Sequence, residues 1–163
     1  MTRLSMHGTQ ITLPQDTEIL ISRVLKATPD QVYRAHTEAA LIQQWLLGPD
    51  GWKMPVCISD ARPGGHFRYE WANEGRGFYA TGEYIEATPN RRLAHIERMF
   101  LPERTPEMRV ITEFTPEGHG TCMTMRMILP DLAARDATLA SGMTDGIEIC
   151  YARLDRQTAD PAA

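Results

Sequence analysis

Residues 52–130 alternate apolar and polar side chains with a period of two, and this feature constrains the fold more than any other. Such alternation is typical of strands whose two faces meet different environments. Short segments rich in Pro, Gly, Asn and Glu interrupt it, and several of these residues favour tight turns. The pattern therefore predicts an antiparallel meander of strands joined by hairpins, at 53–59, 66–72, 78–87, 92–100, 108–115 and 121–129.

The chain before this meander predicts two strands and two short helices. Residues 11–25 read as a short strand, a turn and a longer strand. Thr28 and Gln31 have the spacing of a capping box, which marks the start of a helix. One face of that helix carries Val32, Ala35 and His36. A second short helix follows over residues 38–47 and ends at a glycine.

After the meander, residues 131–157 return to helical spacing. A single stripe carries Met143, Ile147, Cys150 and Leu154, so we predict one long amphipathic helix. A curved sheet with one buried face needs a cover, and this helix is the obvious candidate. The predicted fold class is α+β, with one domain over 11–158 between a flexible tail at 1–10 and a C-terminal tail at 159–163.

Composition narrows the classes of partner. The 163 residues hold 17 Lys and Arg against 21 Asp and Glu, a net charge of −4 without any basic cluster. This balance argues against a nucleic-acid partner, which needs clustered cations. The three cysteines are widely spaced, which fits reduced thiols in a cytoplasmic protein. Apolar segments long enough to span a bilayer are absent from the sequence, so we expect no membrane insertion.

Two glycine-rich segments resemble phosphate-binding loops but predict turns. The sequence RPGG at 62–65 lies between two predicted strands, and GRGFYA at 75–80 also runs into a strand. Phosphate-binding loops work because a helix follows and directs its N-terminal amides at the anion. Since a strand follows in both cases, we interpret the glycines as hairpin turns.

Catalytic and metal-binding motifs are scarce. The five histidines lack the spacings typical of a metal site, and we find neither a nucleophile elbow nor a cofactor motif, so we expect no metal and no cofactor. The best candidates for acid–base chemistry are His95 and Glu97, which share one face of the strand at 92–100. That face is inward if Leu93 and Met99 are buried. It is solvated if Ala94, Ile96 and Phe100 form the buried face instead.

The order of these segments resembles a known family. It is similar to the bacterial members of the activator of heat-shock protein 90 ATPase family, within the SRPBCC or START-like superfamily. The matching segments are ITLPQDTEILISRV (11–24), ATPDQVYRAHT (27–37), Trp45 with GPDG (48–51), DARPGG (60–65), GEYIEATPNRRL (82–93), VITEF (110–114), GT (120–121) and SGMTDGIEICYARLD (141–155). Departures include Leu46 and Ile147, where many members have tryptophan. These departures bear on the identity of the ligand rather than on the fold.

This resemblance implies a helix-grip fold, in which a curved antiparallel sheet wraps around the long C-terminal helix and leaves a hydrophobic cavity between them. A small hydrophobic or amphipathic molecule would bind there. The expected ligand-binding residues are Trp45, Phe67, Tyr69, Trp71, Tyr79, His95, Met99, Val110, Thr112, Met123, Met125, Met143, Ile147 and Tyr151. Methionine and aromatic side chains suit ligands of varied shape, although the same residues also form ordinary cores.

Two other functions stay open at this point. The family name suggests a chaperone-associated module that stimulates a heat-shock protein 90-type ATPase. The wider superfamily also contains enzymes. The third hypothesis is therefore a hydrolase or cyclase that uses His95 and Glu97 on a buried hydrophobic substrate. We favour a non-catalytic binder, because the sequence has no identifiable catalytic set. Related domains often pair, which leaves room for a homodimer.

Overall fold

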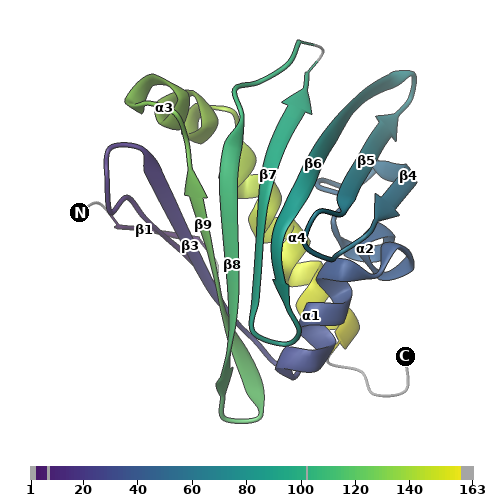
Figure 1. The fold of residues 1–163 in the computed structure, drawn as a ribbon, viewed down its shortest axis with the longest axis vertical. Helices are drawn as coiled ribbons and strands as arrows, with labels where there is room; N and C mark the ends of the chain where they lie inside the picture. The colour runs from purple at the N-terminus through teal and green to yellow at the C-terminus, as the bar shows by residue number, and fades with distance from the viewer. Residues whose placement is uncertain (1–2, 7, 102, 159–163) are drawn as a thin grey trace.

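A computed structural model describes residues 3–6, 8–101 and 103–158. Within these residues the chain forms a nine-stranded antiparallel sheet and four helices (Figure 1). The strands are β1 (Arg3–Met6), β2 (Thr9–Thr12), β3 (Glu18–Leu25), β4 (Lys53–Ser59), β5 (His66–Asn73), β6 (Arg76–Thr88), β7 (Arg92–Phe100), β8 (Met108–Glu117) and β9 (Gly120–Ile128). The helices are α1 (Pro29–Thr37), α2 (Ala39–Trp45), α3 (Leu132–Ala140) and α4 (Met143–Thr158).

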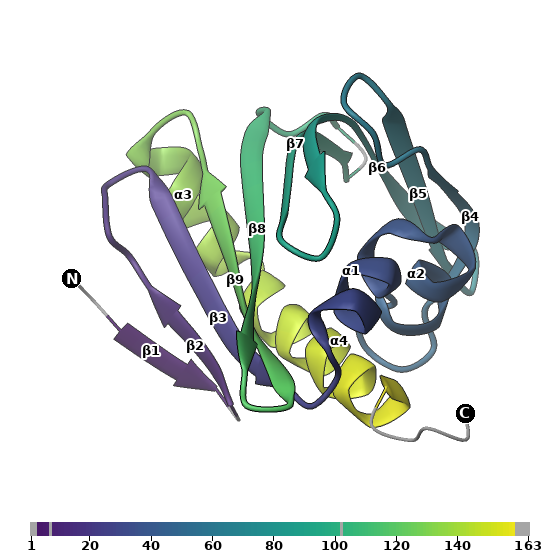
Figure 2. The same ribbon diagram turned by 60° about the horizontal axis from the view of Figure 1, so that its bottom comes forward.

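The sheet has the order β1-β2-β3-β9-β8-β7-β6-β5-β4. Strands β4 to β9 are neighbours in sequence order, as a meander requires, and β3 pairs with β9. The sheet bends around α4, while α1 and α2 lie beside the C-terminal half of α4 and α3 lies by its start (Figures 1 and 2). We call the face toward α4 the concave face and the opposite face the convex face. This is the predicted α+β architecture.

Local sequence signals account for most element boundaries. The Thr28 hydroxyl accepts from the Gln31 amide at 3.3 Å, and the Gln31 side chain accepts from the Thr28 amide at 3.0 Å, which confirms the capping box of α1. The glycines at 64 and 65 form the tight turn between β4 and β5. Gly64 has a φ of +83°, and a Cβ on Gly65 would lie 1.9 Å from the Asp60 carbonyl oxygen. The turn interpretation of this segment is therefore confirmed.

The structure corrects two expectations at the ends of the chain. The first ten residues were expected as a loose tail, but β1 pairs with β2, and Thr9 on β2 is fully buried. The predicted long helix is divided into α3 and α4, because Gly142 adopts a φ of +85° and ends the first helical segment. Ser141 then accepts from the Met143 amide at the start of α4. The expected tail at 159–163 lies outside the described residues.

The core fills the space between the concave face and the helices. Its largest fully buried members come from β2, β3 and β9 and from the C-terminal half of α4, and they include Ile11, Ile19, Ile21, Leu25, Met123, Tyr151 and Leu154. A buried ion pair also ties α4 to the sheet: Arg23 on β3 contacts Glu148 at 2.5 Å, and the Thr9 hydroxyl donates to the same carboxylate.

Candidate functional site

The register of β7 places His95 and Glu97 on the concave face. His95 lies opposite Tyr84 on β6 and Val110 on β8, and both of these residues are buried. The alternative register, with Ala94 and Ile96 facing inward, is therefore wrong. The His95 side chain is 17% exposed and that of Glu97 is 19% exposed, so water still reaches both groups on the inner side of the sheet.

A cluster of polar side chains surrounds this pair, and we call it the concave polar cluster: Ser59, Tyr69, Tyr84, His95 and Glu97. The Ser59 and Tyr84 hydroxyls are 3.0 Å apart, and the Tyr84 hydroxyl is also hydrogen-bonded to Tyr69. His95 Nε2 lies 3.2 Å from Glu97 Oε1. Burial raises the pKa of both tyrosines, so they are neutral hydrogen-bonding groups near pH 7.

The cluster can orient a polar group and hold a proton. A carboxylate that accepts from one imidazole nitrogen leaves the other nitrogen as an acceptor, which is the arrangement of a general base with its orienting group. The distance between His95 and Glu97 satisfies that geometry. Geometry of this kind suits acid–base chemistry and ligand orientation equally well.

A second imidazole, the half-buried His36 on α1, also lies on the inner side of the sheet. Its ring centroid is 4.8 Å from that of Trp45 and 5.3 Å from that of Phe114. Burial lowers the pKa of His36 to about 4, and the proximity of His95 also disfavours the charged form. His36 Nδ1 lies 2.8 Å from the Val32 carbonyl oxygen, and a carbonyl can only accept. The hydrogen of the neutral ring is therefore on Nδ1, and Nε2 carries none.

The apolar residues of the concave face divide into a sealed group and an accessible group. Seven of the expected ligand-binding residues are buried: Trp45, Phe67, Tyr69, Val110, Thr112, Met123 and Tyr151. Five others are only half-buried: Trp71, Met99, Met125, Met143 and Ile147. The two from the helix lie in the N-terminal half of α4, so water reaches the concave face from that half.

The sealed group is held in place by ring contacts and hydrogen bonds. The Trp45 ring stacks against Tyr151 with centroids 5.9 Å apart, and its Nε1 donates to the Ala35 carbonyl. Trp71, from the half-buried group, borders this region and donates from Nε1 to the Leu46 carbonyl at 2.8 Å. The Tyr151 hydroxyl lies 3.7 Å from the Met125 sulfur. These contacts close the region at the C-terminal half of α4.

Tyr79 was expected among the ligand-binding residues and lies elsewhere. Its ring stacks on Phe100 at 4.4 Å, and the Arg68 guanidinium lies 4.3 Å from its centroid. Tyr79 precedes Ala80, which is buried on the concave face, so alternation along β6 places Tyr79 on the convex face. The expectation for Tyr79 was therefore wrong.

Sequence reasoning missed three residues of this region, His36, Ser59 and Tyr84, as members of a site. A signal existed for His36, which shares the apolar face of α1 with Val32 and Ala35. For Tyr84 the signal was its alternation with Ala80 and Gly82 along one strand. Ser59 carried no comparable signal, because it ends its strand and is drawn inward by the pairing of β4 with β5.

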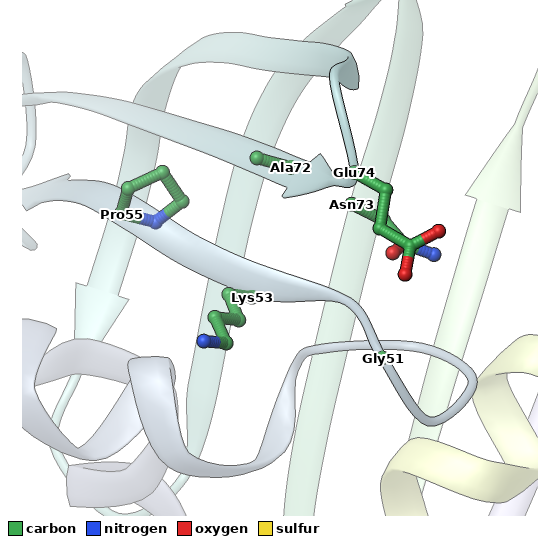
Figure 3. Close-up of a pocket in the computed structure, with 6 residues that line it drawn as sticks. All are labelled: Gly51, Lys53, Pro55, Ala72, Asn73 and Glu74. Carbon is green, nitrogen blue, oxygen red and sulfur yellow. The ribbon is translucent and has the colours of Figure 1, made fainter.

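A surface depression of about 400 Å³ lies away from this region, at the sheet edge (Figure 3). It is formed where β4 begins and β5 ends. It is lined by Gly51, Lys53, Pro55, Ala72, Asn73 and Glu74. None of the expected ligand-binding residues is among them.

The cysteines show no activation. Burial raises the pKa of the Cys57 thiol to about 11 and also raises those of Cys122 and Cys150, so the thiolate that a nucleophile requires is disfavoured. Among the described residues, no group of three or more His, Cys, Asp or Glu side chains could hold a metal ion. Nor does any helix of the described chain have the length and hydrophobicity needed to cross a membrane.

A nine-stranded curved sheet that grips a C-terminal helix, with two short helices before the meander, defines a helix-grip protein of the SRPBCC superfamily. Residues 26–158 match the model of the family described as "Activator of Hsp90 ATPase homolog 1-like protein". The chain belongs to this family. The resemblance noted from the sequence is confirmed.

Solved structures agree with this assignment. A protein from Rhodobacter sphaeroides is 34% identical, with a TM-score of 0.87, over 93% of this chain and 98% of that one. A protein from Nitrosomonas europaea is 25% identical, with a TM-score of 0.76, over 88% and 95% of the two chains. A Mycobacterium smegmatis protein at 17% identity, with a TM-score of 0.81 over 96% of each chain, shares the fold. The comparison with curated proteins gives no match.

Proposed function

We propose that this protein binds a small hydrophobic or amphipathic molecule on its concave face, beside the N-terminal half of α4. One observation carries the proposal: Met125, Met143 and Ile147 pack against the core, and Met99 lies opposite the buried Ala80 on the same face, yet each of the four remains partly accessible to water. A ligand that covers accessible apolar side chains on an inner surface is bound favourably, because their apolar surface is removed from water.

The polar residues beneath this surface would orient the ligand. A molecule that removes roughly 200 Å² of apolar surface from water gains on the order of 5 kcal/mol, before the costs of association are subtracted. That gain does not select one orientation. The concave polar cluster supplies hydroxyl, imidazole and carboxylate groups at fixed positions, which is the usual source of orientation in apolar sites.

Two tryptophan variants of α4 test the location of the site. Ile147→Trp places a large ring on the concave side of the helix, and Ile149→Trp places the same ring at a position that is 38% exposed. A library of lipophilic compounds is screened by thermal shift, since a ligand that binds only the folded state raises the melting temperature. We expect the apparent affinity of the hits to fall at least tenfold in Ile147→Trp and to stay at the wild-type level in Ile149→Trp.

The result that contradicts the proposal is equally specific. If no compound stabilises the wild type, or if hits bind both variants as tightly as the wild type, the concave face is not the binding site. NMR shifts of the Met125 and Met143 methyl groups on addition of a hit locate the ligand independently of the variants.

The family description favours a second candidate, the stimulation of an Hsp90-type ATPase. That function needs a protein surface rather than an internal site, so Ile147→Trp should leave it unchanged. The measurement is ATP turnover by a purified Hsp90 homologue with and without this protein. Unaltered turnover at saturating protein rules the second candidate out.

A further inference from the structure

His36 presents an unprotonated nitrogen to the interior of the protein. Its Nδ1 donates to the Val32 carbonyl, so Nε2 is an acceptor. Within the described residues, Nε2 has no hydrogen-bond partner. Arg92 Nε is the fully enclosed side-chain nitrogen or oxygen of the described residues that lacks a partner, and His36 is half-buried, so Nε2 is not completely enclosed.

The surroundings of Nε2 are apolar. The ring lies between Trp45 and Phe114, both about 3% exposed, and the Trp45 indole nitrogen already donates to Ala35. An acceptor in such a place loses free energy unless water or a bound molecule donates to it. His95 contributes to the lowered pKa of His36, so the two imidazoles lie within electrostatic range of one another on the inner side of the sheet.

We infer that His36 Nε2 accepts a hydrogen bond from a hydroxyl or N–H group of the bound molecule, and that the ligand class is therefore an apolar body with a neutral donor at its inner end. This inference rests on the proposed binding on the concave face. It excludes a carboxylate at the inner end, since a neutral Nε2 cannot donate and the Glu97 carboxylate lies in the same region. It also disfavours an ether, which offers no donor.

Three probes with the same naphthalene body distinguish these ligand types. They are 2-naphthol, which carries a neutral donor, 2-methoxynaphthalene, which carries an ether, and 2-naphthoate, which carries a carboxylate. Dissociation constants are measured by calorimetry at pH 7 for the wild type and for His36→Phe, which keeps an aromatic ring. His66→Phe is the matched control, because His66 is exposed on the convex face. We expect 2-naphthol to bind the wild type about five- to tenfold more tightly than 2-methoxynaphthalene, the usual effect of one net hydrogen bond, and 2-naphthoate to bind most weakly.

The preference for 2-naphthol should disappear in His36→Phe and persist in His66→Phe. A measurement on the wild type alone guards against misfolding of the variant: the Nε2 resonance of His36 should move on addition of 2-naphthol and stay in place with 2-methoxynaphthalene. If both probes bind equally well, or if the preference survives His36→Phe, the inference is wrong while the binding proposal stands. If none of the three probes binds and the lipophilic library also gives no hit, both are wrong.

Discussion

The neutral imidazole of His36 has a consequence for stability at acid pH. Its pKa in the folded protein is about 4, below the ordinary value of 6.5, because burial disfavours the charged ring. Between these two values the unfolded chain binds a proton that the folded chain does not, so stability is complete above pH 6.5 and falls as the pH drops toward 4. The contribution of His36 to the free energy of unfolding should fall by about 2 kcal/mol between pH 7 and pH 5.

Urea denaturation at pH 7, 6 and 5 measures this loss. Carboxylates titrate in the same window, so the informative quantity is the difference between the wild type and His36→Phe. We expect the wild type to lose about 2 kcal/mol more than the variant over this interval. Parallel pH profiles for the two proteins would show that the imidazole is not held neutral by the fold.

At the residue scale the sequence predicted which side chains alternate, but it did not determine which face of β7 is turned toward the core. Leu93 with Met99 and Ala94 with Ile96 are equally apolar, so hydropathy alone does not separate the two registers. Pairing with buried residues on both neighbouring strands decides the matter in favour of His95 and Glu97. The same long-range contacts placed Tyr79 on the convex face, which the sequence did not predict.

At the scale of elements, the junction between α3 and α4 gives a matched pair of glycines. Added Cβ atoms at Gly142 and Gly146 both meet nothing within 4 Å, so neither alanine causes a clash. The two positions differ in backbone conformation, because Gly142 has a φ of +85° and Gly146 lies inside α4. Gly146→Ala should stabilise the protein by about 0.5–1 kcal/mol through better helix propensity.

Gly142→Ala should instead destabilise the protein by about 1 kcal/mol, since an L residue at a positive φ is strained. Chemical denaturation of the two variants under identical conditions measures both changes. Two shifts of the same sign would contradict the assignment of the helix break to the conformation of Gly142.

The same junction shows where prediction of elements succeeded and where it failed. Strands bounded by turn residues and a helix begun by the Thr28 capping box were predictable, because their signals are local. The break at Gly142 was missed, because residues 131–157 as a whole have helical spacing and a single glycine within them does not identify a helix end. Strand β1 was missed because its four residues form a strand only by pairing with β2 at the edge of the sheet.

At the scale of the whole molecule, a meander and a terminal amphipathic helix were enough to predict the fold class. They were not enough to place the accessible region, which depends on how far each helix covers the concave face. Hydrogen bonds between α4 and the segment around the end of α2 decide this: Arg153 donates to the carbonyls of Trp45 and Gly48, and the Gly48 amide donates to the Cys150 sulfur. These contacts join segments about a hundred residues apart, so local sequence patterns do not predict them.

The uneven attachment of α4 predicts uneven hydrogen exchange along it. Its C-terminal half is fixed by the two Arg153 hydrogen bonds, by Gln157 donating to the Gln44 carbonyl, and by the buried Tyr151 and Leu154. Its N-terminal half packs through Met143 and Ile147, which are half-buried, and within the described residues it is tied to the sheet by the Glu148 carboxylate alone, against three hydrogen bonds and two buried side chains in the other half. Local opening is easier where fewer contacts must break, so the amides of residues 147–149 should exchange at least tenfold faster than those of 151–154.

A ligand on the concave face should reduce this difference, because it adds contacts to the half of α4 that has fewest. With 2-naphthol at a concentration well above its dissociation constant, exchange at 147–149 should slow while exchange at 151–154 changes little. Ile147→Trp offers the comparison, since its ring occupies the same surface and should slow exchange without any ligand. Equal exchange rates along the whole of α4, or protection by the ligand confined to 151–154, would place the accessible region at the other end of the helix.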